Sequence, residues 1–143
     1  MGSLASGHLL ALPVRLHGIE LGRSVELIVD LDVRRVLGFE VRCGDEVHRF
    51  LPLGAARIHD GEIAIASPLI LLDELPFYRA RGRGLGALRG ARVRNAGGEL
   101  GTFRDLVFGE EGEIHELVVA SPSGELHVPP AADVRIATRA SAA

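Results

Sequence analysis

Hydrophobic residues along this chain fall in short runs rich in Val, Leu and Ile, with no sustained 3.6-residue period. Turn residues separate the runs: CGDE at 43–46, HDGE at 59–62, NAGG at 95–98, GEEG at 109–112 and SPSG at 121–124. Asp60-Gly61, between two apolar runs, is a strong signal for a two-residue hairpin. Short strands at regular spacing predict an all-β protein, either a sandwich or a barrel. Helical turns are suggested only near residues 53–57 and 129–133.

One stretch of the sequence recurs later in the chain, where GIELGRSVELIVD at 18–30 aligns without a gap on GGELGTFRDLVFG at 97–109. The identical pairs are Gly18 and Gly97, Glu20 and Glu99, Leu21 and Leu100, Gly22 and Gly101, and Leu27 and Leu106. With small slips the match extends from Val14, opposite Val93, to AARI at 55–58, opposite DVRI at 133–136. The offset between the copies stays nearly constant over this length, and a chance match would not keep its register so well. The sequence therefore indicates an internal duplication.

The repeated glycines have a physical interpretation. Gly18 and the pair Gly97-Gly98 lie where a hairpin must turn, and glycine adopts positive φ there without steric cost. Gly22 and Gly101 lie inside strand patterns, where a small barrel needs a sharp bend or a bulge.

This order of turns, Leu-Gly bends and apolar strands resembles the PRC-barrel family, and residues 87–136 resemble it better than residues 9–66. That family includes the cytoplasmic domain of the photosynthetic reaction-centre H subunit and the C-terminal domain of a ribosome small-subunit maturation factor. The resemblance implies two small β-barrel modules, at 8–72 and 87–138, packed side by side or partly merged, with an Arg/Gly-rich linker at 73–86. The family motif falls on Gly18, Gly22, Leu27, Pro52, Gly97, Gly101, Leu106 and Pro129.

The two copies differ at their ends. The first copy closes with EIAIAS at 62–67 after the Asp-Gly hairpin, and the second has no such strand. A strand from elsewhere, an exchange of strands between the halves, or a partner chain could fill that place, because an open β edge is a site for pairing. A homo-oligomer is therefore one alternative.

Composition narrows the function classes. The net charge of -3 gives no global basic field that would recruit nucleic acid or anionic lipid. The single Cys43 excludes an intramolecular disulfide and fits a reducing cytoplasm. The longest apolar stretch, 63–72, contains Ser67 and Pro68 and falls short of the roughly 20 residues that a membrane span needs.

An arginine-rich segment, residues 79–94, joins the two copies. Its arginines follow Phe77 and Tyr78, and no acidic residue lies between Glu74 and Glu99. The segment could bind phosphate with an aromatic side chain as a stacking platform, or it could be a solvated linker. The candidate binding residues are Tyr78, Arg79, Arg81, Arg83 and Arg89. GRGLGA at 82–87 fits a dinucleotide fingerprint, but the strand before it and the helix after it are not predicted.

Other residue patterns predict no catalytic or metal site. The six histidines form no close pair, and His127 is expected opposite Val118 in a hairpin. Cys43 and His48 lack a third group that would orient a catalytic base. The acidic cluster Glu110, Glu111, Glu113 and Glu116 lies at a hairpin tip and is too short for a calcium loop. We therefore expect no catalytic residue, no metal, no cofactor and no small-molecule substrate.

In the families that this chain resembles, the barrel docks onto a protein complex and performs no chemistry itself. The resemblance therefore implies a non-catalytic cytoplasmic adaptor or assembly module, which binds another protein through barrel edges and loops. The alternative is an RNA- or ribosome-associated factor that uses the Arg-rich segment 79–94, although the net charge opposes it. An enzyme would need a convergent pair of catalytic groups, and the sequence presents none.

Overall fold

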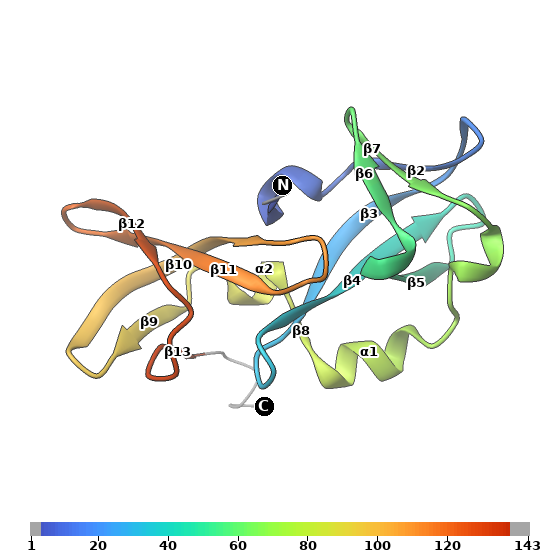
Figure 1. Ribbon diagram of the computed structural model, residues 1–143. Coiled ribbons are helices and arrows are strands. Elements are labelled where there is room, and N and C mark those ends of the chain that lie inside the picture. The colour runs from blue at the N-terminus through green and yellow to red at the C-terminus, as the bar shows by residue number, and fades with distance from the viewer. Residues whose placement is uncertain (1–3, 138–143) are drawn as a thin grey trace.

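The computed structural model describes residues 4–137, and the strands within this range form two sheets (Figure 1). The first sheet has the spatial order β5 (His48–Pro52), β4 (Arg35–Cys43), β3 (Ile19–Asp30), β2 (Pro13–Leu16), β7 (Glu62–Ile65) and β6 (Arg57–His59). The second has the order β12 (Gly124–Val128), β11 (Ile114–Ser121), β10 (Gly98–Phe108), β9 (Arg92–Asn95) and β13 (Arg135–Ala137). Two further short strands are β1 (Leu4–Ala5) and β8 (Arg83–Gly84).

The prediction of a mainly β protein is confirmed, and the prediction of closed barrels is not. Within residues 4–137 each sheet is open, because its outermost strands do not pair with one another. The hairpin at Asp60-Gly61 forms as predicted, with both residues at positive φ. The pairing of Val118 with His127 is confirmed as well.

Helical segments are more numerous than the pattern suggested. They are α1 (Leu75–Arg81), α2 (Leu85–Leu88) and the 3₁₀ turns η1 (Ser6–Leu9), η2 (Leu53–Ala55) and η3 (Pro68–Ile70). The turn near 53–57 is present as η2, whereas residues 129–133 form no helix. α1 was not predicted; Pro76 lies in its first turn, where its missing N–H costs no hydrogen bond. Among residues 4–137, no helix is long and apolar enough to cross a membrane.

Residues that align in the sequence repeat have equivalent strand partners in the two sheets. Val14 pairs with Gly22 in the first sheet, and Val93 pairs with Gly101 in the second. The pairing of β3 with β4 and the pairing of β10 with β11 also shift register at matching places: at Ser24–Glu26 and Phe103–Asp105, then at Ile28–Val29 and Val107–Phe108. We call residues at matching places in this pairing counterparts.

Gly22 and Gly101 are counterparts at which only glycine fits. A Cβ on Gly101 would lie 2.1 Å from the carbonyl oxygen of Ala120, and its φ of +147° disfavours any other residue. A Cβ on Gly22 would lie 2.4 Å from the carbonyl oxygen of Arg42. The sequence predicted a bend or a bulge at these glycines, and a register shift is present at each, between Glu20 and Gly22 and between Glu99 and Gly101.

Each half lends a short segment to the other. β1 pairs with β10 of the second sheet, and β8 pairs with β3 of the first. The Gly7 N–H donates to the Asp105 carboxylate at 3.0 and 3.1 Å, and the Gly86 N–H donates to the Glu26 carboxylate at 3.3 and 3.1 Å. Gly7 and Gly86 are separated by the same offset that separates Gly22 from Gly101, and so are Glu26 and Asp105. The exchange is therefore reciprocal, with the same carboxylate position holding the incoming segment on both sides.

The predicted difference between the ends of the copies is present. In the first sheet β7 lies between β2 and β6, whereas in the second β13 pairs directly with β9. Within residues 4–137 the second sheet thus has no counterpart of β7. Exchange between the halves does occur, but at β1 and β8 rather than at this place.

One hydrophobic core joins the two sheets. Leu27 and Phe39 from the first sheet and Phe103 and Leu106 from the second are fully buried in the same cluster. The expected linker, 73–86, contains α1, β8 and the first residues of α2. The division into modules at 8–72 and 87–138 stays a prediction, and its last residue lies outside the described range.

Candidate binding surface

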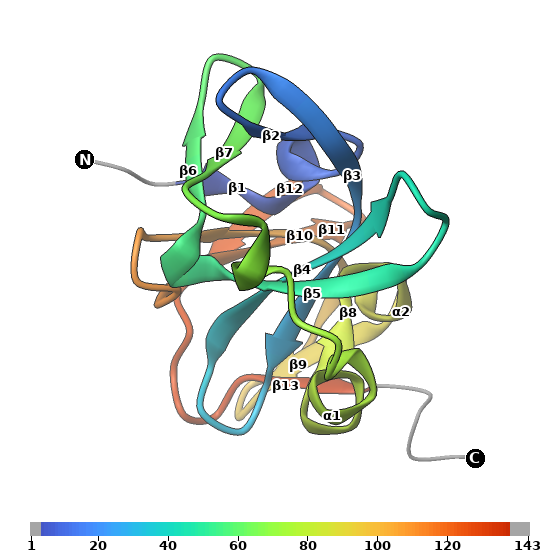
Figure 2. The same ribbon diagram turned by 90° about the vertical axis from the view of Figure 1, so that its right-hand side faces the viewer.

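α1 lies over the outer face of the first sheet (Figure 2). Its Leu75 is 4% exposed and packs with Ile28 and Phe50 in a small apolar cluster. Tyr78 stacks on Phe50, with ring centroids 3.7 Å apart and planes inclined by 8°. The apolar surface of this face is therefore buried by the protein's own chain.

The edge of β5 is also occupied. Phe50 and Leu72 exchange two backbone hydrogen bonds, in which each N–H donates to the other residue's carbonyl, at 2.9 and 2.8 Å. Leu72 lies shortly ahead of α1 in the chain, so one continuous segment pairs with the sheet edge and then covers the sheet face. We call this segment, residues 72–81, the α1 cover.

An ion pair fixes the α1 cover to the sheet. The Arg79 guanidinium donates to the Glu40 carboxylate at 3.1 and 2.6 Å, and the His48 Nδ1 lies 2.5 Å from the same carboxylate. Burial of Glu40 would raise its pKa, but the hydrogen bonds from Arg79 and His48 outweigh burial and hold the pKa below its usual value. Glu40 is therefore a buried carboxylate that depends on α1 for its compensation.

The corresponding face of the second sheet has a different surface. The counterparts of the residues that contact the α1 cover are Val107 for Ile28, Val118 for Glu40 and His127 for Phe50. These three residues line a groove of about 760 Å³, together with Ala5, His8, Arg89, Asp105 and Glu125. Among the described residues, β12 pairs with β11 alone, so its other edge is open. We call this surface the second-sheet groove.

Acidic side chains surround His127 at the open edge. Its Nδ1 contacts the Glu116 carboxylate, and its Nε2 lies 3.2 Å from the Glu125 carboxylate. The hydrogen bond to Glu116, followed by that to Glu125, raises the pKa of His127. Two carboxylates thus share one imidazole, which leaves this end of the groove with excess negative charge whenever both acids are ionised.

The candidate binding residues of the sequence are not gathered on one surface. Tyr78 and Arg79 belong to the α1 cover, Arg81 and Arg83 line a second cavity, and Arg89 lines the second-sheet groove. Arg81 lies over the Phe77 ring, 5.5 Å from its centroid, and Arg89 donates to the Arg104 carbonyl at 3.2 Å. The role of these residues in binding stays a prediction.

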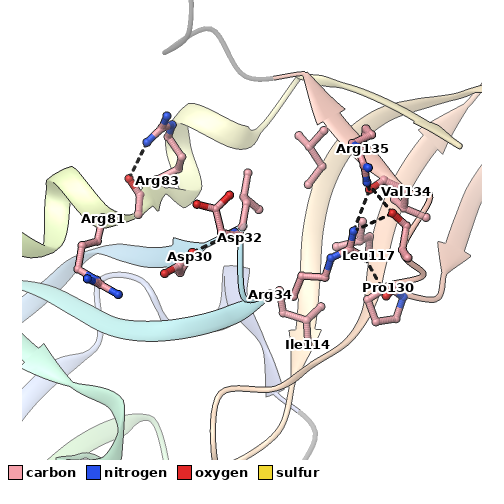
Figure 3. Close-up of a pocket in the computed structure, with 14 residues that line it drawn as sticks. Asp30, Asp32, Arg34, Arg81, Arg83, Ile114, Leu117, Pro130, Val134 and Arg135 are labelled. Carbon is pink, nitrogen blue, oxygen red and sulfur yellow. Dashed lines mark hydrogen bonds between the residues drawn. The ribbon is translucent and has the colours of Figure 1, made fainter.

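The second cavity, of about 600 Å³, lies between the β3–β4 turn, the start of β8 and the loop before β13 (Figure 3). Arg34 reaches across it and donates to the backbone carbonyls of Pro130, Ala131, Ala132 and Val134. Asp30 and Asp32 line the cavity beside Arg83, whose Nε is buried without a hydrogen-bond partner. Side chains of both charges therefore line this cavity. The hydrogen bonds of Arg34 across it connect the β3–β4 turn of the first sheet to the loop before β13 of the second.

Cys43 and His48 are engaged by different partners and form no catalytic pair with each other. The Cys43 Sγ contacts the Val41 carbonyl at 3.9 Å, and His48 is engaged by Glu40. Within residues 4–137, no group of three or more His, Cys, Asp or Glu residues could hold a metal ion.

The second-sheet groove was missed by sequence reasoning, which treated His127 as an isolated histidine and Glu116 as part of a hairpin-tip cluster. A signal was present upstream of the repeat. The same ungapped offset continues through Gly7 and Gly86, Leu9 and Leu88, Val14 and Val93, and Arg15 and Arg94. That extension would have placed both exchanged segments, although the open groove itself follows from three-dimensional packing.

No family model matches this chain, and no curated protein matches its sequence.

Proposed function

We propose that this protein is a non-catalytic adaptor or assembly module, which binds another protein through the open edge and outer face of its second sheet. The observation that carries the proposal is that one of two corresponding sheet faces is covered by the chain and the other is not. The first face and its β5 edge are occupied by the α1 cover, whereas β12 and the second-sheet groove are free of any described segment. An open strand edge beside a groove is a common way for a domain to bind an extended segment of another protein.

We further propose that the two halves arose by internal duplication of a PRC-barrel-like unit. The matching bulges, the matching glycines and the reciprocal exchange, all at one offset, support this origin. By analogy with that family, we propose that the protein docks onto a protein complex and that it is cytoplasmic.

Site-specific photo-crosslinking tests the function. A benzophenone amino acid is placed at position 125, which is exposed on β12, and in a control at position 69, which is 85% exposed on η3. Irradiation in the cells of origin should give one discrete protein adduct from position 125 and none from position 69. A ladder of RNA adducts, an adduct of two copies of this chain, or equal labelling from both positions would contradict the proposal.

The RNA-associated alternative gains no support from the geometry, since the arginines of segment 79–94 lie on different parts of the surface. The same crosslinking experiment would identify RNA binding, because RNA adducts would be lost after nuclease treatment. A homo-oligomer would instead give adducts of twice the mass of the chain.

A further inference from the structure

We infer that the second-sheet groove accepts a protein segment of defined form: an extended apolar residue that pairs with β12, followed by a short helix that carries an arginine or lysine. The inference rests on the proposed function and makes its partner specific. The first sheet holds a segment of this form, the α1 cover, at the corresponding place.

Backbone pairing is the first element of the match. β5 and β12 are counterparts at the edges of their sheets, and Phe50, which exchanges two hydrogen bonds with Leu72, is the counterpart of His127. The backbone edge at His127 is unpaired within the described range. An extended residue of a partner can therefore make the same two bonds, and each buried backbone group needs such a partner.

Shape is the second element. In the first sheet, Leu75 and Tyr78 fill the space over Ile28 and Phe50. In the second sheet the corresponding space lies over Val107 and His127 and remains as part of a groove of about 760 Å³. This volume lies within the range of about 300–1,000 Å³ that is usual for small-molecule pockets, so the groove has room for two or three apolar side chains of a partner's helix.

Charge is the third element and selects a basic partner. In the first sheet the acidic residue under the helix, Glu40, is met by Arg79. In the second sheet Glu116 and Glu125 lie along the same strands as Val118 and His127, and both contact His127. Asp105 faces the groove but is already held by Ser6 and Gly7. The remaining charged or titratable groups that line it, His8, Arg89 and Arg104, come from η1, the loop before β9 and β10.

Since the acids gather at the β12 edge and the arginines come from other elements, a cation should enter at the β12 end. An arginine or lysine of the partner would take the place of His127 beside Glu116. A guanidinium can bind a carboxylate through two parallel hydrogen bonds, and an ammonium can pair with it as a point charge.

A peptide with the sequence of residues 70–81, ILLDELPFYRAR, is the probe, because this segment has the required form. It is titrated into the intact ¹⁵N-labelled protein, and amide shifts are followed by NMR. We expect saturable shifts centred on Val107, Val118 and His127. The double variant E116Q/E125Q should weaken binding by about fivefold or more, as expected for the loss of two partly exposed ion pairs. The matched control E110Q/E111Q removes two acids from the β10–β11 turn and should leave the affinity unchanged.

Three results would overturn the inference. They are the absence of shifts at millimolar peptide, equal binding by E116Q/E125Q and the wild type, and shifts centred on Phe50 and Ile28, which would mean that the peptide displaces α1. Failure here is separable from failure of the proposed function: a protein adduct from position 125 with no peptide binding would reject this segment form alone. Absence of any protein adduct would reject the function itself.

Discussion

The two sheets share their strand pairing, their bulges and their glycines, yet only the first has its outer face covered by a helix. Phe50 and Glu40 require burial and compensation, and the α1 cover supplies both through Tyr78 and Arg79. The counterparts of these two residues, His127 and Val118, line a groove that no described helix covers. One framework therefore carries a helix in one half and leaves a groove in the other, and we propose that this groove is the binding surface.

The exchange of β1 and β8 shows that the halves are not independent. Each half receives a strand from the other, and the same carboxylate position, Asp105 or Glu26, receives an N–H from the incoming segment. A shared core reinforces the connection. A destabilising substitution in one half should consequently lower the free energy of unfolding of the whole molecule.

The largest expected effect tests this coupling. Leu27→Ala and Leu106→Ala each empty a fully buried counterpart position, so each should lower the free energy of unfolding by about 2–5 kcal/mol. Urea unfolding followed by circular dichroism should show one transition, and both variants should shift it. Two transitions, each sensitive to one variant only, would show that the halves unfold separately.

A smaller effect should distinguish the two exchange contacts. Asp105 accepts bonds from Ser6 and Gly7, whereas Glu26 accepts from Gly86. Asp105→Ala should therefore lower the free energy of unfolding by about 2 kcal/mol, and Glu26→Ala by about half as much. Equal losses in urea unfolding would show that the Ser6 hydroxyl adds nothing to the exchange.

The ion pair under α1 gives a pH-dependent difference between the sheets. Arg79→Ala should cost about 1 kcal/mol at pH 7, because buried Glu40 loses a charged partner. The pKa of Glu40 is lowered in the folded protein, so its contribution is present above the unfolded value of 4.5 and is lost as pH falls through the folded pKa. Unfolding measured from pH 7 to pH 3 should show the two proteins converging. A difference that stays constant with pH would contradict this role of Arg79.

The sequence predicted the fold class, the Asp60-Gly61 hairpin and the bulges at Gly22 and Gly101, because these depend on local patterns of apolar residues and glycine. The predicted small barrels are not closed within residues 4–137, since closure depends on distant edges meeting. α1 was missed because only Leu75 among its residues is buried, which leaves no apolar period to detect.

The candidate site was less accessible to sequence reasoning than the fold. Arginines close together in the chain suggested one binding surface, but the turns of α1, β8 and α2 direct Arg79, Arg83 and Arg89 to different places. Glu116 and His127 lie on different strands and meet only through the β11–β12 register. The groove beside them was identified by comparison with the face of the first sheet that α1 covers.

The smallest effect concerns the open edge itself. In Glu116→Gln the pKa of His127 should fall towards 6.5, because the hydrogen bond to the Glu116 carboxylate contributes most to raising it. Since the folded pKa is raised, the stabilisation by this contact is present below the unfolded value and is lost as pH rises through the folded pKa. Titration of the His127 ring by NMR measures the change, and Glu110→Gln should leave the titration as in the wild type. An unchanged pKa in Glu116→Gln would show that the contact is absent in solution.

Amide hydrogen exchange of the intact protein, alone and with the protein captured by crosslinking at position 125, tests most directly whether the second-sheet groove is the binding surface. We expect the bound partner to slow exchange in β12 and at Val107 and Val118, while β5 and α1 exchange as before. Protection confined to β5, to α1 or to the cavity at Arg34 and Arg83 would show that the partner binds elsewhere.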